Sequence, residues 1–203
     1  MNRKKTSESS PKVESERTLA FISRNIKCPE KHRQDEKELS LENLMKRLEI
    51  TMMQKSRLDS LERYQNVIRL YDDALKINPN FIEAWLNKGF VLYSLKKYNE
   101  AIKAFDEVLR IDSHLADAWY HKANSLFKLK KYEEANRAYD EVLKVRPYFK
   151  NAWNNKGNVL SALNKHSQAV QMYDKAIEID PQFTEAIYNK ANEILLMGMK
   201  FQV

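Results

Sequence analysis

The chain has 203 residues, of which 35 are Lys or Arg and 28 are Asp or Glu, so its net charge is +7. Only three glycines and five prolines interrupt it, which indicates an almost wholly helical protein. The single cysteine, Cys28, excludes an internal disulfide, and no apolar run approaches the roughly 18 residues that a membrane span needs. The positive excess is spread along the chain, which argues against a basic nucleic-acid face. With no secretion signal in the sequence, we expect a cytoplasmic protein.

Residues 1–40 form a polar segment of mixed charge with little apolar periodicity. Such a composition cannot bury enough surface to offset the entropy lost on ordering, so we predict a largely disordered arm. Two interpretations of this arm remain open: an ordinary solvated tail, or a tether or docking segment.

Residues 41–81 read as a helical hairpin that matches the later repeats only in part. Leu41, Leu44 and Leu48 share one helical face, and Tyr71 in the second helix takes the position of a repeat aromatic. The first helix lacks the expected tryptophan and glycine. Because terminal repeats have one face without a neighbour, we interpret 41–81 as a degenerate first repeat that caps the array.

Residues 82–183 consist of three copies of one pattern, over 82–115, 116–149 and 150–183. Trp85, Trp119 and Trp153 recur every 34 residues, a period typical of helix–turn–helix arrays. The pattern resembles the tetratricopeptide repeat (TPR) family. The resemblance is carried by a small residue in the first helix (Gly89, Ala123, Gly157), an alanine in the second (Ala101, Ala135, Ala169), an aromatic after it (Phe105, Tyr139, Tyr173) and a closing proline (Pro147, Pro181).

This resemblance implies an all-α fold: a right-handed solenoid of helical hairpins behind a disordered N-terminal arm. A single hairpin cannot bury both of its apolar faces, so each repeat must stack on the next. The periodic tryptophans and tyrosines are therefore interpreted as packing residues rather than as a cofactor site.

Residues 184–203 contain the first helix of a further, truncated repeat. Ile187, Ala191 and Ile194 lie on its packing stripe, and several more apolar residues follow. These are Leu195, Leu196, Met197, Met199, Phe201 and Val203. The sequence leaves two interpretations open: a frayed end of a truncated array, or a surface for weak self-association.

Catalysis finds no support in the sequence. None of His32, His114, His121 and His166 has metal-ligand spacing to a cysteine or to another histidine. Neither a glycine-rich phosphate loop nor a hydrolase motif occurs, and the recurring carboxylates of the second helices are interpreted as a solvated face. We expect no enzyme activity, no metal and no cofactor.

The TPR resemblance places the first helix of each repeat along a concave groove, and this groove is the candidate binding site. The expected peptide-binding residues are Asn87, Tyr120, His121, Asn124, Asn154, Asn155, Asn158, Tyr188, Asn189 and Asn192. An asparagine amide carries a donor and an acceptor, so a row of them can hold an extended peptide, as in the superhelix of O-linked GlcNAc transferase that this row resembles. The alternative is that duplication of one parental repeat copied these asparagines without a function.

We therefore predict a protein–protein interaction module or scaffold that captures a peptide segment of a partner in this groove. The carboxylate clamp by which some TPR proteins bind acidic chaperone tails is absent, because Leu86 and Phe90 replace its Lys and Asn. The runner-up is a nucleic-acid-associated helical repeat that uses the basic arm and a lysine edge. That edge consists of Lys88, Lys122, Lys156 and Lys190. Membrane association is not expected.

Overall fold

The computed structural model describes residues 40–47 and 60–200. They belong to two compact units, Met1–Arg47 and Leu48–Val203, and the described part of the first unit is a helix over 40–47. The second unit contains the helices α3 (Ser60–Ile77), α4 (Ile82–Ser94), α5 (Tyr98–Ile111), α6 (Ala116–Lys128), α7 (Tyr132–Val145), α8 (Lys150–Ala162), α9 (His166–Ile179) and α10 (Thr184–Lys200). Neither described range contains a strand. The predicted all-α helical-repeat solenoid is confirmed.

Some predictions fall outside the described residues. The arm over 1–39 is one of them, and most of the first helix expected in the 41–81 hairpin falls on 48–59. The expected apolar residues Phe201 and Val203 lie beyond the described range as well.

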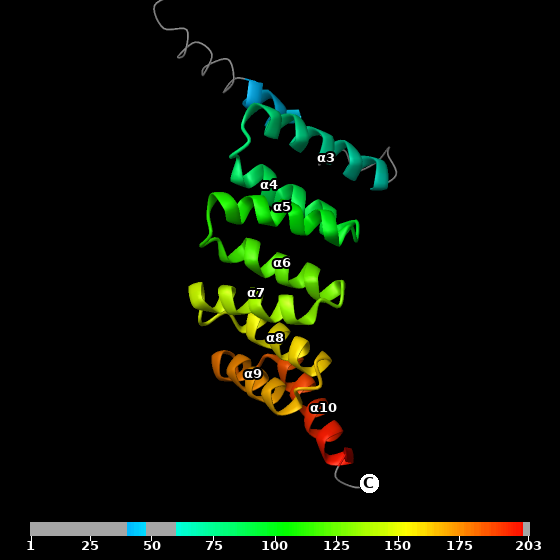
Figure 1. The fold of residues 1–203 in the computed structure, drawn as a ribbon, viewed down its shortest axis with the longest axis vertical. Coiled ribbons are helices and arrows are strands. Elements are labelled where there is room, and N and C mark those ends of the chain that lie inside the picture. Colours follow the sequence, from blue (N-terminus) through cyan, green and yellow to red (C-terminus); the bar gives the residue numbers. More distant parts are fainter. Residues whose placement is uncertain (1–39, 48–59, 201–203) are drawn as a thin grey trace, which may run out of the picture. The chain divides into compact units, whose positions relative to one another are not determined.

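The helices of the second unit alternate between two types. α4, α6, α8 and α10 begin at residues 82, 116, 150 and 184, at the interval that the tryptophans predict. We call these four the A-type helices, and α5, α7 and α9, which follow the first three of them, the B-type helices. Figure 1 shows α3 to α10 stacked in chain order.

Each turn between an A-type helix and the B-type helix that follows it contains one residue with a left-handed backbone conformation. Lys96, Lys130 and Asn164 have φ values of 60°, 60° and 58°. At each turn the next residue's N–H reaches back five residues, as in the bond of 2.9 Å from Lys97 N to Leu92 O. This geometry is a Schellman C-cap, in which glycine is the usual left-handed residue.

A tryptophan links each of α4, α6 and α8 to the turn before it. In every case the indole N–H donates to a backbone carbonyl six residues earlier. The bonds run from Trp85 Nε1 to Pro79 O (2.9 Å), from Trp119 Nε1 to Ser113 O (2.9 Å) and from Trp153 Nε1 to Pro147 O (2.7 Å). The periodic tryptophans are thus structural, as expected.

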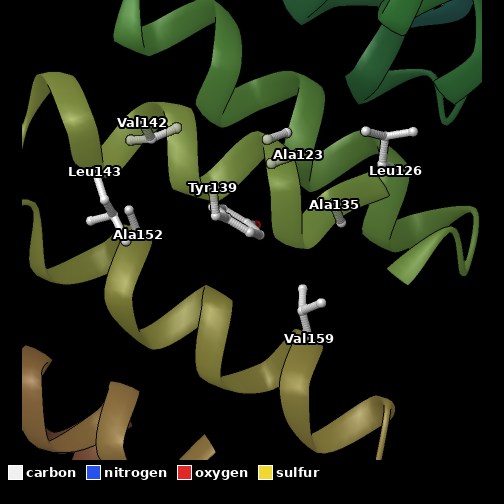
Figure 2. Packing of buried hydrophobic residues seen from close by; sticks show 9 residues of the cluster. Ala123, Leu126, Ala135, Tyr139, Val142, Leu143, Ala152 and Val159 are labelled. Atoms are coloured by element: carbon white, nitrogen blue, oxygen red, sulfur yellow. The ribbon is translucent and has the colours of Figure 1, made fainter. Parts of the chain in front are cut away.

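The core of each repeat is built on a small residue of the A-type helix that faces an aromatic of the B-type helix. A Cβ atom added to Gly89 would lie 2.5 Å from Phe105 Cε1, so the ring occupies the space that the glycine leaves. In the middle repeat, Ala123 and Tyr139 belong to one buried cluster. Figure 2 shows Tyr139 at the centre of this cluster, between α6 and α8. Burying such rings supplies much of the stabilising energy of a repeat.

Successive A-type helices contact one another, whereas within the described residues α5 does not contact α7, nor α7 contact α9. The A-type helices therefore approach one another along one side of the stack, and we call the exposed surface of α4, α6, α8 and α10 on that side the A-helix face.

Candidate functional site

The contact between successive A-type helices is made at three equivalent junctions. Each junction joins a residue of one A-type helix, the aromatic residue of the B-type helix that follows it, and a residue of the next A-type helix. The three sets are Phe90, Phe105 and His121; Asn124, Tyr139 and Asn155; and Asn158, Tyr173 and Asn189. Half of the ten predicted site residues thus lie in these junctions, where one repeat meets the next.

Two of these junctions are built from amides and a hydroxyl group. At the first, Asn155 Nδ2 donates to Asn124 Oδ1 at 3.2 Å, and the Tyr139 hydroxyl donates to the same oxygen. At the second, Asn189 Nδ2 donates to the Oδ1 atom of Asn158 at 3.2 Å. That oxygen also accepts a bond of 2.8 Å from the Tyr173 hydroxyl. Each amide oxygen therefore accepts two hydrogen bonds inside the protein.

Further bonds extend these junctions into one network along α6, α8 and α10. Asn155 Nδ2 also donates to the Tyr120 hydroxyl oxygen at 3.0 Å, and Asn189 Nδ2 donates to Asn154 Oδ1 at 3.0 Å. Asn154, which is only 1% exposed, donates through Nδ2 to Glu185 at 3.1 Å. We call the set formed by Asn124, Asn154, Asn155, Asn158 and Asn189 with the hydroxyls of Tyr120, Tyr139 and Tyr173 the amide network.

The network fixes how two of its amides are turned. Because the Oδ1 atoms of Asn124 and Asn158 both accept from tyrosine hydroxyls, their Nδ2 groups must point the other way. The Asn124 amide also lies within hydrogen-bonding reach of the Tyr120 hydroxyl, where it lowers the pKa of that phenol, and each Nδ2 group carries a second hydrogen. Asn124 and Asn158 are half-buried, and neither Nδ2 group is among the described side-chain atoms that are fully buried without a partner, a set that consists of Asn136 Oδ1. The structure thus presents two oriented donors, one repeat apart.

The junction between α4 and α6 is aromatic instead. The His121 ring lies 4.4 Å from the Phe90 ring and 5.9 Å from the Phe105 ring, measured between centroids. Burial lowers the pKa of His121 below its usual 6.5, against the opposing effect of the Asp117 carboxylate. We call Phe90, Phe105 and His121 the aromatic cluster.

Tyr120 contacts both the aromatic cluster and the amide network. Its ring packs 5.2 Å from His121 and 4.9 Å from Phe149, while its hydroxyl accepts from Asn155. Burial raises the pKa of this phenol, so the hydroxyl stays neutral at physiological pH. The A-helix face therefore changes from aromatic at α4 to amide-rich at α8.

Three predicted site residues belong neither to these junctions nor to the amide network. Asn87 is half-buried on α4, whereas Tyr188 and Asn192 are exposed on α10, Tyr188 with 66% of its surface accessible. These two exposed side chains are therefore free to meet a ligand at the end of the A-helix face.

The four lysines of the predicted edge are each paired with an aspartate of the preceding helix. The pairs are Lys88 with Asp72 (2.5 Å), Lys122 with Asp106 (2.6 Å), Lys156 with Asp140, and Lys190 with Asp174 (2.6 Å). Lys88 and Lys122 also lie over the tryptophan rings of their own helices. The lysines and these carboxylates form a seam between repeats rather than separate charged faces.

One buried cluster has no counterpart in the earlier repeats. Glu193 of α10 is 4% exposed, accepts a hydrogen bond from the Ser161 hydroxyl and lies 2.7 Å from His166 Nδ1. In the earlier repeats the positions of Ser161 and His166 hold aromatic pairs, such as Tyr93 and Tyr98 at 5.4 Å. The carboxylate lies between the hydroxyl and the imidazole, which differs from the order of a hydrolytic triad. The cluster joins α10 to the α8–α9 hairpin.

The described ranges lack metal-ligand clusters and membrane-spanning helices. Residues 40–47 and 60–200 contain no group of three or more His, Cys, Asp or Glu side chains arranged to hold a metal ion. None of the helices in those ranges is both long and apolar enough to cross a membrane.

Comparison with known proteins agrees with this architecture. The family model of subunit 3 of the anaphase-promoting complex, or cyclosome, matches residues 60–142, and the tetratricopeptide repeat model matches residues 151–183. A search of curated proteins finds no match. Together with the structures below, these matches confirm the predicted family: the chain belongs to the tetratricopeptide repeat proteins.

Several solved structures share the fold. A crystal structure of the MamA protein is 23% identical with a TM-score of 0.65, over 70% of this chain and 78% of that one. YrrB, described as a TPR protein with an unusual peptide-binding site, is 22% identical with a TM-score of 0.60, over 68% and 72%. The first TPR of Spaghetti (RPAP3), bound to the HSP90 peptide SRMEEVD, is 21% identical with a TM-score of 0.56, over 58% and 93%. These structures show that the helical-repeat fold is shared.

Proposed function

We propose that the A-helix face binds an extended peptide segment of a partner protein. The observation that carries this proposal is the pair of oriented amide donors, Asn124 Nδ2 and Asn158 Nδ2. Groups fixed by internal hydrogen bonds lose little entropy when a ligand arrives, which favours binding. Since they occur at the same position in adjacent repeats, they suit the recurring carbonyl oxygens of an extended backbone.

This proposal uses fewer amide contacts to the peptide than the predicted asparagine ladder. A ladder of unengaged amides would offer a donor and an acceptor at each step. Here the Oδ1 atoms of Asn124 and Asn158 and both hydrogens of Asn155 Nδ2 are already used within the protein. The proposed contacts are therefore donor contacts from Asn124 and Asn158, with Asn192 as a third, exposed amide.

The aromatic end of the face supplies the second half of the proposed site. Phe90, Tyr93 and Tyr120 are partly exposed on α4 and α6, next to the aromatic cluster. Partly buried aromatic side chains are preferred anchors for apolar ligand residues. We infer a ligand whose apolar residues meet α4 and α6 and whose backbone carbonyls meet α6 and α8.

The ligand chemistry differs from that of the acidic HSP90 peptide in the Spaghetti structure. The A-helix face carries the exposed carboxylates of Glu83 and Glu185, and Asp117 is paired with Arg146 at 2.7 Å. Exposed carboxylates disfavour an acidic ligand by like-charge repulsion. The ligand we propose is therefore neutral or basic.

The runner-up function, nucleic-acid binding, gains no support from the described residues. It relied on the basic arm, which lies outside them, and on four lysines that are each paired with an aspartate. A paired ammonium group has less to gain from a phosphate. Peptide capture is therefore the function that we propose.

The test uses substitutions that remove the outward donors and keep the internal acceptors. In Asn124→Asp/Asn158→Asp, the remaining oxygen still accepts from tyrosine, but the solvent-facing NH2 group becomes a carboxylate oxygen. Peptides are selected from a random library on the full chain, and their affinities are measured for both proteins. Two lost hydrogen bonds of about 1 kcal/mol each should weaken binding roughly 30-fold.

The matched control is Asn80→Asp/Asn99→Asp, which adds the same charge at two exposed positions away from the A-helix face. This control should bind the selected peptides with unchanged affinity. Equal affinities of the wild-type and Asn124→Asp/Asn158→Asp proteins would contradict the proposal.

A further inference from the structure

The last described helix, α10, is held on the array through one side only. Ala186 is fully buried, and Lys190 pairs with Asp174 of α9 at 2.6 Å. Asn189 and Glu193 bond to side chains of the α8–α9 hairpin on the same side. These contacts seat α10 as an A-type helix and determine which of its sides faces away from α8 and α9.

The side of α10 that faces away is an apolar stripe formed by Ile187, Ala191 and Ile194, which we call the α10 stripe. Ile187 is 44% exposed, Ile194 is 52% exposed, and Ala191 is also exposed. The residues that correspond to Ile194 in the complete repeats are Leu92 (2% exposed), Leu126 (3%) and Leu160 (4%). The same position thus changes from core to surface at α10.

The complete repeats show what covers this position elsewhere. In the middle repeat, Ala123 of α6 leaves room for Tyr139 of α7, and both are buried in one cluster (Figure 2). Ala191 stands on α10 where Gly157 stands on α8, one repeat earlier, and where Ala123 stands on α6, two repeats earlier. The α10 stripe therefore has a small residue with an apolar residue on either side, the same arrangement that receives a B-type helix three times within this chain.

We propose that the α10 stripe docks an amphipathic helix of a partner protein, and that this helix has the chemistry of a B-type helix. Its defining feature is an alanine followed four residues later by an aromatic, as in Ala135 and Tyr139. The docked helix would continue the interface between A-type and B-type helices by one further helix. Helices that lay an apolar face against such a surface are a recurring mode of recognition.

The burial of the described B-type helices argues against a second folded copy as the source of the docked helix, so the partner we propose is a different protein. Phe105, Tyr139 and Tyr173 are at most 1% exposed, so a second copy could offer none of them without opening a repeat. The proposed site also lies apart from the A-helix face, so it does not depend on the proposed peptide function.

The test measures binding of a helical probe to the full chain. The probe is a labelled peptide with the sequence of residues 132–145, which form α7, stapled because isolated helices of this length are unstable in water. Fluorescence anisotropy should show saturable binding to the wild-type protein. Ala191→Arg should weaken it by about tenfold or more, because an arginine fills the place of the probe's aromatic ring.

Two controls separate docking from indirect effects. Leu196→Arg adds the same charge to an exposed position on the opposite side of α10 and should bind the probe like the wild type. A probe with Tyr139→Ala should bind the unchanged protein about tenfold more weakly, since it lacks the aromatic anchor. This second control requires no change in the protein, so it holds even where Ala191→Arg disturbs α10.

Either of two results would overturn the proposal. The first is a probe that does not bind saturably, or that binds wild-type and Ala191→Arg proteins alike. The second comes from sedimentation equilibrium of the full chain: a dimer that Ala191→Arg abolishes, in a protein that does not bind the probe, would show that the stripe is covered by a second copy.

Discussion

Successive A-type helices contact one another through two different chemistries. The contact is an aromatic cluster between α4 and α6, and an amide network between α6, α8 and α10. Phe90, Phe105 and His121 stack ring against ring, whereas Asn124, Tyr139 and Asn155 form hydrogen bonds at the equivalent positions. The residues change as a set, because an amide oxygen needs a hydroxyl partner when buried and a phenyl ring does not. The unit that varies between repeats is thus the junction rather than the single residue.

This difference also bears on the proposed role of the asparagines. The aromatic cluster shows that two repeats can stack without an amide at these positions. Stacking alone therefore does not account for the choice of asparagine, and the proposed peptide contacts use the Nδ2 groups of Asn124 and Asn158.

The largest expected effect is on the free energy of unfolding. It is tested by placing leucine at the residue that the next A-type helix contributes to a junction, which is Asn155 in the amide network and His121 in the aromatic cluster. In Asn155→Leu the Tyr120 hydroxyl and Asn124 lose a donor, which should lower the free energy of unfolding by about 2 kcal/mol. In His121→Leu the new side chain still packs on Phe90, so the loss should stay below about 1 kcal/mol. Urea unfolding of both variants measures the difference, and equal losses would show that the hydrogen bonds contribute nothing specific.

A second pair of substitutions tests how rigidly the aromatic of each B-type helix is held. A Cβ atom on Gly157 would collide with Tyr173, whose hydroxyl is bonded to Asn158, while a Cβ on Gly89 would collide with Phe105, which has no hydroxyl. The Phe105 ring is fully buried but is not held by a hydrogen bond, so it can adjust at somewhat less cost. We expect both variants to be destabilised, Gly157→Ala by about 2 kcal/mol and Gly89→Ala by about 1 kcal/mol after the gain in helix propensity. Thermal unfolding compares the two, and a larger loss for Gly89→Ala would contradict the rigid-tyrosine argument.

A third prediction concerns pH, because the aromatic cluster contains a titrating group and the equivalent Asn155 does not titrate. Burial lowers the pKa of His121 below 6.5 in the folded chain, so the unfolded chain binds the proton more readily. The stabilising contribution is therefore fully present above the unfolded pKa of 6.5 and is lost as the pH falls from there through the lower pKa of the folded state. Between about pH 7.5 and about pH 5.5, wild type should lose more unfolding free energy than His121→Asn. Parallel slopes in urea unfolding would contradict this.

The period of the repeats made most of the fold predictable. The tryptophan spacing placed the A-type helices, and the alternation of small and aromatic residues indicated which sides pack. These features repeat because every complete hairpin has the same neighbours, so one sequence pattern suffices for all.

The orientation of the asparagines was not predictable in the same way. Asn124 bonds to Tyr139, 15 residues later, and to Asn155, 31 residues later, so its state depends on residues in two other helices. A single-position comparison of repeats treats Asn124 and Phe90 as unrelated substitutions. The signal was nonetheless present, since phenylalanine occurs with Phe105 and His121, and asparagine with tyrosine and a second asparagine.

The pairing of Glu193 with His166 was, for a different reason, not predictable from the sequence. Its position in the earlier repeats holds Val91, Ser125 and Val159, all buried, so a carboxylate there indicates a local partner. His166 replaces the tyrosine of the two preceding hairpins and is that partner. Two departures from the repeat pattern, 27 residues apart, explain each other only once the helices are folded together.

The smallest expected effect compares the turns of the two regions. Lys130 and Asn164 both adopt a left-handed conformation, with φ values of 60° and 58°. Lysine has a Cβ conflict there that glycine lacks, whereas asparagine tolerates this region through local hydrogen bonding. Lys130→Gly should therefore raise the free energy of unfolding by about 0.5–1 kcal/mol, and Asn164→Gly by less. Thermal unfolding of the two variants provides the measurement. An equal gain in both would show that the amide side chain contributes nothing to the turn of the third hairpin, and that asparagine there is merely another residue tolerated at a strained position.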